Sequence, residues 1–252
     1  MPARSSLDQR IAALSAHWEL HLPEGPGPFP VIVQLHGCGG KKPFQTTWAQ
    51  VARNAGAAVI VIDSHKHRGI SRLMAYGGVC TGAMLQGRER AGDLFAALAW
   101  ARRQSWADPS KMIAAGWSHG GWTISDALSF RDHAEMVRAT GLADLDEEPL
   151  AGLRGVFLVY PYLGVGTIRG RRWRLAPRTV AIIGGKDSIA GGWLPMSQLD
   201  RVRLGGTPVD IKVFETATHA FDEPEARDLR VRYDPELTTQ GHALYEGLLR
   251  AL

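Results

Sequence analysis

The sequence has only two cysteines among its 252 residues, Cys38 and Cys80, which is too few for a disulfide framework. Neither cysteine stands in a Cys-x-x-Cys pair or in a Cys/His spacing typical of zinc sites. Two free thiols in a reducing compartment are the simpler prediction, and a single Cys38–Cys80 bridge is the alternative. The chain is therefore not expected to depend on several disulfides or on a structural zinc ion.

Long apolar runs and a strong excess of one charge are also missing. No apolar stretch approaches the roughly 20 residues that a membrane-spanning helix requires, and the N-terminal residues lack the unbroken apolar segment of a secretory signal. We therefore expect a cytoplasmic protein with no membrane partner. The 29 basic and 25 acidic side chains give a formal charge of +4, which is mild for this length and does not suggest a nucleic-acid partner.

Two local clusters of polar residues have simple interpretations. The densest basic stretch is IRGRRWR, whose arginines are Arg169, Arg171, Arg172 and Arg174. It could attract an anionic ligand, but a solvated loop is the simpler prediction. His65 and His67 form an HKH sequence with no acidic or cysteine partner placed nearby, so we expect no metal there.

Short apolar, β-branched runs recur along the whole chain, and no repeat or linker divides it, so residues 1–252 are expected to form one domain. The runs predicted as strands are 18–23, 30–36, 57–63, 111–117, 155–162, 178–185 and 209–215. Helical patterns lie between them at 44–56, 87–104 and 241–252, the second with its arginines and an acidic residue away from the apolar side. This alternation predicts an α/β fold, a mainly parallel central sheet with helices on both faces in a three-layer sandwich. Its ligand site should lie at the carboxyl ends of the strands.

The stretch GWSHGG at residues 116–121 places Ser118 between glycines. A G-x-S-x-G sequence carries chemistry only where a strand runs into it and a helix runs out, and both are predicted here. Gly116 and Gly120 remove side chains where strand and helix crowd together, so a strained turn can expose the serine hydroxyl. Ser118 is thus a candidate nucleophile, and an ordinary turn residue is the alternative.

A serine hydroxyl needs a general base, and the base needs an acid that fixes its tautomer. Asp187 and His219 each follow the end of a predicted strand. The order Ser118, Asp187, His219 matches the chain order of this triad on an open α/β sheet. The alternatives are Asp187 as a turn former, Asp63 as the acid in its place, and His219 in a structural role.

The strand at 30–36 breaks into the glycine-rich loop HGCGG, which can turn backbone N–H groups toward a reacting carbon. The N–H groups of Cys38 and His119 are the expected donors of an oxyanion hole, since His119 begins the helix after the serine. His36 is expected to brace this loop rather than to transfer protons.

Together, LHGCGG, GWSHGG, GGKD and THAF resemble the dienelactone-hydrolase-like branch of the α/β-hydrolase superfamily, from Trp18 to the C-terminus. The resemblance implies an α/β-hydrolase fold and a cofactor-free hydrolase with Ser118 as nucleophile, His219 as base and Asp187 as acid. It also implies that Cys38 and His119 supply the oxyanion donors. Dienelactone hydrolases proper have a cysteine at the nucleophile position, and the serine here favours ordinary esters.

These residues predict a serine hydrolase that cleaves small to medium carboxylic esters, with a small-molecule ester as its partner. Cleavage of amides, carbamates, peptides or lactones on the same triad, or a non-catalytic binding protein of this fold, are the alternatives. Segments 69–87, 131–153 and 189–196 are expected to roof the pocket. The candidates for its lining are Tyr76, Met84, Trp117, Trp122, Trp193 and Leu194.

Overall fold

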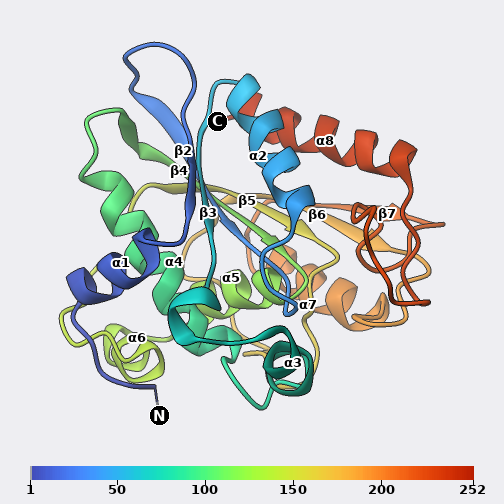
Figure 1. The fold of residues 1–252 in the computed structure, drawn as a ribbon, viewed down its shortest axis with the longest axis horizontal. Coiled ribbons are helices and arrows are strands. Elements are labelled where there is room, and N and C mark those ends of the chain that lie inside the picture. Colours follow the sequence, from blue (N-terminus) through green and yellow to red (C-terminus); the bar gives the residue numbers. More distant parts are fainter. Residues whose placement is uncertain (1) are drawn as a thin grey trace.

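A computed structural model describes residues 2–252 and contains a seven-stranded sheet (Figure 1). Its strands are β1 (Glu19–His21), β2 (Phe29–Leu35), β3 (Ala58–Ile62), β4 (Ala107–Trp117), β5 (Leu153–Val159), β6 (Arg178–Gly184) and β7 (Val209–Phe214). The spatial order is β1-β3-β2-β4-β5-β6-β7. Strand β1 is antiparallel to β3, and all other neighbours are parallel. The predicted mainly parallel α/β sheet is confirmed.

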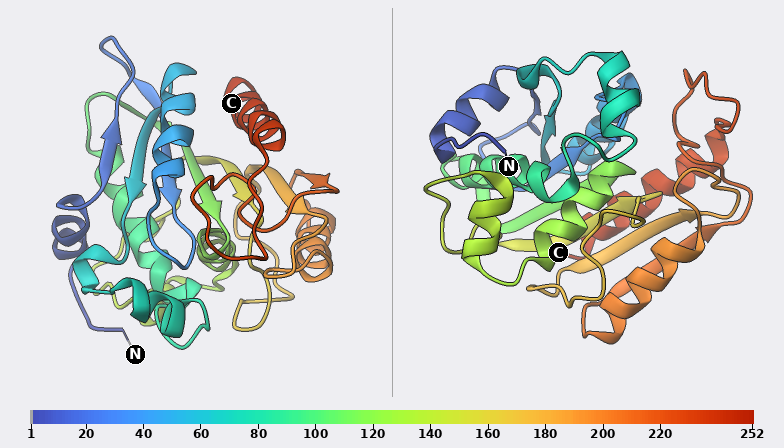
Figure 2. Two further views of the ribbon diagram at one scale, coloured as in Figure 1. Left: turned by 45° about the vertical axis from the view of Figure 1, so that its right-hand side comes forward. Right: turned by 90° about the horizontal axis from the view of Figure 1, so that it is seen from below.

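Helices cover both faces of the sheet. They are α1 (Leu7–Ser15), α2 (Pro43–Asn54), α3 (Arg72–Met74), α4 (Gly87–Arg102), α5 (His119–Ser129), α6 (His133–Thr140), α7 (Trp193–Leu204) and α8 (Pro235–Arg250), with the short turns η1 (Lys66–Arg68) and η2 (Ala75–Val79). Helices α2 and α8 lie together on one face, and α1, α4, α5, α6 and α7 pack on the other (Figures 1 and 2). The expected three layers are therefore present.

The central strands are buried on both sides because their apolar residues alternate between two cores. In β2, Val31, Val33 and Leu35 pack toward α1 and α4, whereas Ile32 packs toward α2 and α8. Successive side chains of a strand point to opposite faces, so only a continuous apolar run can fill both layers. The near-continuous runs in the sequence have this physical cause.

Helix α4 corrects one expectation from the sequence. Its Arg90 and Asp93 were expected on polar sides of an amphipathic helix, but both are fully buried. Helix α4 packs against the sheet while α1, α5 and α6 cover its other sides, so no solvent-facing side is left at these positions. A buried charge needs partners, which are described below.

Helices α1, α6 and α7 were not predicted. Helix α1 begins with a capping box, in which the side chains of Ser6 and Gln9 each accept a hydrogen bond from the other's backbone N–H. The expected roof segments at 131–153 and 189–196 contain α6 and the start of α7, respectively. Within residues 2–252, no helix combines the length and apolar character that crossing a bilayer would require.

The basic stretch IRGRRWR lies outside helices and strands, as predicted, but it is only partly solvated. Arg171 Nη1 lies 2.9 Å from both carboxylate oxygens of Glu135 in α6. Trp173 of the same stretch is buried and packs in the core on the side of the sheet that α4 covers. Part of this stretch therefore anchors its loop to the helical layer.

Candidate active site

Three side chains from separate strand ends meet at the carboxyl edge of the sheet. Ser118 follows β4, Asp187 follows β6, and His219 follows β7. His219 Nε2 lies 3.0 Å from Ser118 Oγ, and His219 Nδ1 lies 2.7 Å from Asp187 Oδ2. All three residues are largely buried. The structure thus brings together the serine, histidine and aspartate that the sequence singled out.

The hydrogen bonds around Asp187 determine which nitrogen of His219 carries the proton. Asp187 Oδ1 accepts the N–H groups of Ile189 at 2.8 Å and Ala190 at 2.9 Å, which leaves Oδ2 for His219. A carboxylate only accepts, so His219 Nδ1 donates and Nε2 is free to accept the hydroxyl proton of Ser118. This arrangement can remove a proton from the serine.

Asp63 is not the acid partner of His219. Its Oδ1 accepts the backbone N–H groups of His65 and Lys66, both at 3.0 Å, and so stabilises the turn after β3. The alternative that placed Asp63 in the triad is therefore wrong. Aspartate is favoured in such turns because its side chain can accept from the backbone two or three residues ahead.

Ser118 stands on a strained turn. Its backbone has φ 50° and ψ −109°, a conformation that non-glycine residues rarely adopt. A Cβ on Gly116 would lie 2.5 Å from the backbone carbon of Gly120, and a Cβ on Gly120 would collide with the carbonyl oxygen of Leu35. Only glycines therefore allow strand and helix to approach closely enough to hold this turn.

The glycine-rich loop after β2 lies against the serine. A Cβ on Gly37 would be 3.6 Å from the Cβ of Ser118, and Cys38 is the next residue. His119 is the first residue of α5, so its N–H has no acceptor within the helix. The structure places both candidate oxyanion donors next to Ser118, and their role in stabilising an oxyanion stays a prediction.

His36 braces this loop, as expected. Its Nε2 accepts the N–H of Ser64 at 3.1 Å, so its Nδ1 carries the proton that bonds the carbonyl of Gly37 at 2.6 Å. Burial and the nearby Arg90 guanidinium hold the pKa of His36 well below its usual value. A neutral ring with both nitrogens engaged is a structural support rather than a proton carrier.

Cys38 and Cys80 form a disulfide, with Cα atoms 5.0 Å apart. The prediction of two free thiols is therefore wrong, because the fold brings together two segments that are 42 residues apart in sequence. The bridge ties the loop at Cys38 to the end of η2. Tyr76 of η2 also packs on this loop, since its hydroxyl lies 3.5 Å from where a Cβ on Gly39 would be. Disulfides persist mainly in oxidising compartments, so this one counts against the predicted cytoplasmic location. The location stays a prediction.

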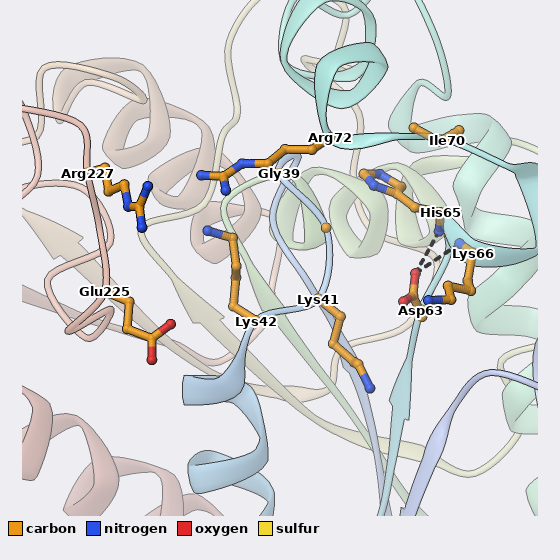
Figure 3. A pocket seen from close by; sticks show the side chains of 11 residues that line it. Gly39, Lys41, Lys42, Asp63, His65, Lys66, Ile70, Arg72, Glu225 and Arg227 are labelled. Carbon is orange, nitrogen blue, oxygen red and sulfur yellow. Dashed lines mark hydrogen bonds between the residues drawn. The ribbon is translucent and has the colours of Figure 1, made fainter.

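A cavity of about 540 Å³ opens beside the same loop (Figure 3). Gly39 and Gly40 form one wall, and the charged residues that line it are Lys41, Lys42, Lys66, Arg72, Arg227, Asp63 and Glu225. Figure 3 shows the Lys42, Arg72 and Arg227 side chains reaching into it from three separate segments. The cavity is polar and mainly basic, whereas the sequence predicted an apolar pocket. Its lining includes none of Ser118, Asp187 and His219, so it adjoins the glycine-rich loop rather than the triad itself.

Two of the apolar residues expected to line a pocket belong to the core instead. Trp117 is fully buried, and its indole N–H donates to Asp222 at 2.9 Å. Trp122 is also buried, and its indole N–H donates to Asp126 at 2.7 Å. The expectation was wrong for these two because other residues enclose their rings. The Trp117 ring packs against Trp48 of α2 and Tyr245 of α8, and the Trp122 ring packs against His119 and Tyr162.

Of the remaining pocket candidates, three are exposed and Leu194 is half-buried. Tyr76, Met84 and Trp193 are 48%, 37% and 76% exposed, and Leu194 follows Trp193 in α7. None of the four lines the basic cavity of Figure 3. Their contact with a substrate stays a prediction.

His65 and His67 lie at the start of the short turn η1. Among residues 2–252, no group of three or more His, Cys, Asp or Glu side chains is placed to hold a metal ion. Burial lowers the pKa of both His65 and His67 to about 4. Both rings are therefore neutral near pH 7.

The sequence analysis missed two residues behind His219. The Tyr160 ring packs on the His219 ring with centroids 4.7 Å apart, and its hydroxyl donates to Asp222 Oδ1 at 2.6 Å. Asp222 Oδ2 accepts the indole N–H groups of Trp48 and Trp117, both at 2.9 Å. No local pattern indicates this cluster, although Asp222 comes three residues after His219 in the THAFD stretch.

Asp222 should make stability depend on pH. Burial raises its pKa to about 6, although three donors act against the shift. Between about pH 4 and pH 6 the unfolded chain loses this proton and the folded chain keeps it, so the free energy of unfolding falls as pH rises. Two pKa units correspond to roughly 3 kcal/mol.

Urea unfolding of the native chain and Asp222→Asn at pH 4, 5, 6 and 7 measures this contribution. We expect the native chain to lose roughly 3 kcal/mol more stability across this range than the variant. Burial also raises the pKa of Asp126, to about 7, but Asp126 is present in both proteins and cancels in the difference. Parallel pH profiles for the two proteins would contradict the assignment.

Comparisons with known proteins bear on the fold and on the region around Ser118. The model of the prolyl oligopeptidase family matches residues 44–137, which is well under half of the chain and includes Ser118 but neither Asp187 nor His219. None of the curated proteins compared with the chain is similar enough in sequence to match.

Solved structures match over nearly the whole chain. A dienelactone hydrolase-like promiscuous phosphotriesterase from metagenomic libraries is 20% identical with a TM-score of 0.67, covering 93% of this chain and 92% of that one. Esterase 2 of Thermogutta terrifontis phosphorylated by paraoxon is 16% identical with a TM-score of 0.68, covering 93% and 88%. The propionate-bound form of that esterase is 15% identical with a TM-score of 0.66 and the same coverage. The chain therefore has the α/β-hydrolase fold, and its likeness to dienelactone hydrolase-like structures is confirmed at the level of the fold.

Proposed function

We propose that the chain is a serine hydrolase that cleaves small to medium carboxylic esters through an acyl-enzyme. The observation that carries the proposal is the continuous hydrogen-bond chain from Asp187 through His219 to Ser118. The strained backbone of Ser118 at the start of α5 supports it, because strain at a nucleophile is retained where it positions the reacting group.

The first half-reaction forms the acyl-enzyme. Ser118 Oγ attacks the ester carbonyl carbon while His219 Nε2 takes its proton, and Asp187 stabilises the resulting imidazolium. The carbonyl oxygen becomes an oxyanion that accepts from the N–H groups of Cys38 and His119. When the tetrahedral intermediate collapses, the C–O bond to the alcohol breaks and His219 returns the proton to the leaving oxygen.

The second half-reaction releases the acid. Water takes the place of the alcohol, His219 removes its proton, and the hydroxide oxygen attacks the acyl carbon. The bond to Ser118 Oγ then breaks, and His219 returns the proton to the serine. These steps use only groups of the chain and water, so we propose no cofactor.

The comparisons support a hydrolase and leave the bond type open. One neighbour in fold is an esterase, another is a phosphotriesterase, and the family model that matches around Ser118 is that of prolyl oligopeptidases. Amides, carbamates, peptides and lactones could react on the same triad, and a binding protein could keep the fold without using it. The serine nucleophile and the open basic cavity favour a small, polar ester.

Intact mass spectrometry after treatment with a small fluorophosphonate tests the proposal. The native chain should gain one phosphonyl group, because an activated serine displaces fluoride from phosphorus. Ser118→Ala should gain none under the same conditions. A native chain that takes up no label would contradict an assembled triad and would direct attention to ligand binding.

A matched panel of substrates then identifies the bond that is cleaved. The panel pairs each p-nitrophenyl ester with the corresponding anilide, and pairs neutral acyl groups with ones that carry a carboxylate. We expect esters to react faster than anilides, and acyl groups with a carboxylate to show the lower KM because of the basic cavity. Faster cleavage of the anilides would replace the esterase proposal with an amidase.

A further inference from the structure

Arg90 in α4 is a fully buried cation without a carboxylate partner. Its side chain has no exposed surface, and within residues 2–252 no Asp or Glu oxygen lies within 4.0 Å of its guanidinium. Its Nη2 has no hydrogen-bond partner. Burying an unpaired charge is costly, so we looked for a role that the Arg90 guanidinium could have at this position.

Asp93, three residues further along α4, is already paired with other arginines. Asp93 Oδ1 bonds Arg10 at 3.0 Å and Arg68 at 2.9 Å, and its Oδ2 bonds Arg68 at 2.8 Å. These two arginines hold the pKa of Asp93 well below its usual range, although burial alone would raise it. Arg10, Arg68 and Arg90 thus share the single carboxylate of Asp93, and Arg90 is the arginine of the three that does not contact it.

Arg90 contacts both segments that supply the proposed oxyanion donors. Its Nη1 donates to the carbonyl of His36 at 2.7 Å, two residues before Cys38, and lies 3.2 Å from Nδ1 of His119. Its Nε donates to Ser64 Oγ at 2.8 Å, and the N–H of Ser64 bonds the His36 ring. One guanidinium thus joins the loop after β2 to the first residue of α5.

The contact with His119 has a definite polarity. An arginine only donates, so His119 Nδ1 accepts and the ring is neutral. Burial and Arg90 hold the pKa of His119 well below its usual value, which agrees with a neutral ring. Nη1 of Arg90 therefore bridges the His36 carbonyl and the His119 ring, and the bond from Nε to Ser64 fixes the plane of the guanidinium.

We propose that Arg90 is a positioning residue for the oxyanion hole, holding the N–H groups of Cys38 and His119 in place and adding positive charge behind them. The inference rests on the proposed hydrolase function. Negative charge develops on the carbonyl oxygen only in the transition state, so Arg90 should affect kcat rather than substrate binding. Donors displaced by about 1 Å can lower a rate by roughly 100-fold.

The test compares Arg90→Met and Arg90→Lys with the native enzyme on a matched pair of substrates, an ester and its thionoester. Sulfur in place of the carbonyl oxygen accepts hydrogen bonds poorly, so the ester-to-thionoester ratio of kcat/KM reports on the oxyanion donors. Arg10→Met is the matched control. Arg10 is a buried arginine like Arg90, but it pairs with Asp93 and contacts neither His36 nor His119. Tm is measured for every variant.

We expect Arg90→Met to lower kcat by roughly 10- to 100-fold with KM changed less than about threefold, and to lower the ester-to-thionoester ratio. Arg90→Lys keeps the charge but loses the planar guanidinium and its Nε bond to Ser64, so it should fall between Arg90→Met and the native enzyme. Arg10→Met should lower Tm but leave kcat and the ratio unchanged. An unchanged ratio in both Arg90 variants would overturn the proposal and leave Arg90 a structural residue.

Two further outcomes keep the inference separate from the proposed function. If Arg90→Met does not fold, the ratio measured for Arg90→Lys decides the question alone. If the native chain hydrolyses no ester but is phosphonylated, the esterase proposal fails, and the rate of phosphonylation becomes the readout for Arg90 because the phosphoryl oxygen uses the same donors. Equal phosphonylation rates for native and Arg90→Lys would then overturn the role of Arg90.

Discussion

Replacing Ser118 with alanine is expected to lower kcat on the best ester by roughly 10⁵- to 10⁶-fold, the range typical for loss of a triad nucleophile. The variant keeps the oxyanion loop and His219 but has no oxygen to form the acyl-enzyme. KM should change little, because the serine hydroxyl contributes little to binding the ground state. Steady-state rates measured with an active-site-titrated native enzyme check this result.

The same experiment extends to the other two members of the triad. His219→Ala should lose about as much activity as Ser118→Ala, and the double variant should lose no more than either single one, because the residues act as a unit. Additive losses would mean that Ser118 and His219 act in separate steps.

Asp187→Asn has a more specific outcome. The side-chain oxygen of asparagine would accept the N–H groups of Ile189 and Ala190, which turns its NH₂ group toward His219. His219 Nδ1 must then accept, so its proton moves to Nε2, where it can no longer take the proton of Ser118. We expect a loss of roughly 10⁴-fold in kcat with the fold intact.

Ser125→Ala is the matched control for Ser118→Ala. Ser125 lies in α5, is buried, and its hydroxyl has no hydrogen-bond partner. Its removal should leave kcat unchanged and cost little stability. A large loss of activity in Ser125→Ala would mean that changes in α5 act through the fold, and the loss in Ser118→Ala could then not be assigned to the hydroxyl.

Breaking the Cys38–Cys80 disulfide is expected to lower both activity and stability. The bridge closes a segment of 42 residues, for which chain entropy predicts roughly 4 kcal/mol of stabilisation. Without it, the loop that carries the Cys38 N–H is no longer tied to η2. We expect kcat to fall by roughly 10- to 100-fold, since the loss of one oxyanion donor costs about 10²- to 10³-fold.

Serine substitutions separate the tether from the donor. Cys38→Ser and Cys80→Ser both remove the bridge, and both keep the backbone N–H at position 38, so they should lose activity equally. The double variant removes any effect of an unpaired thiol and should match them. Reduction of the native enzyme should produce the same kcat, whereas reducing agent should not change the double variant. Full activity in the double variant would show that the loop keeps its position without the bridge.

Much of the fold and the triad was predictable from the sequence because the signals are local. An apolar run long enough to fill two layers predicts a central strand wherever it occurs, and such runs became β2 to β6. The shorter or more polar runs became β1 and β7 at the edges of the sheet. Parallel strands bring their carboxyl ends to one edge, so residues just beyond separate strands meet there without any knowledge of their contacts. Ser118, Asp187 and His219 were predictable for this reason.

What the sequence did not reveal depends on contacts between distant segments. The direction of Trp117, the burial of Arg90 and the cluster of Tyr160 with Asp222 follow from which helix covers which side of the sheet, and no local pattern records this. The pairing of Cys38 with Cys80 likewise required two loops to fold over the same edge. Local patterns were enough to predict the strands and the meeting of Ser118, Asp187 and His219, because apolar runs indicate strands and parallel strands end at one edge. The disulfide, the buried charges and the basic cavity depend on tertiary contacts, because they arise only where segments far apart in the chain exclude water together.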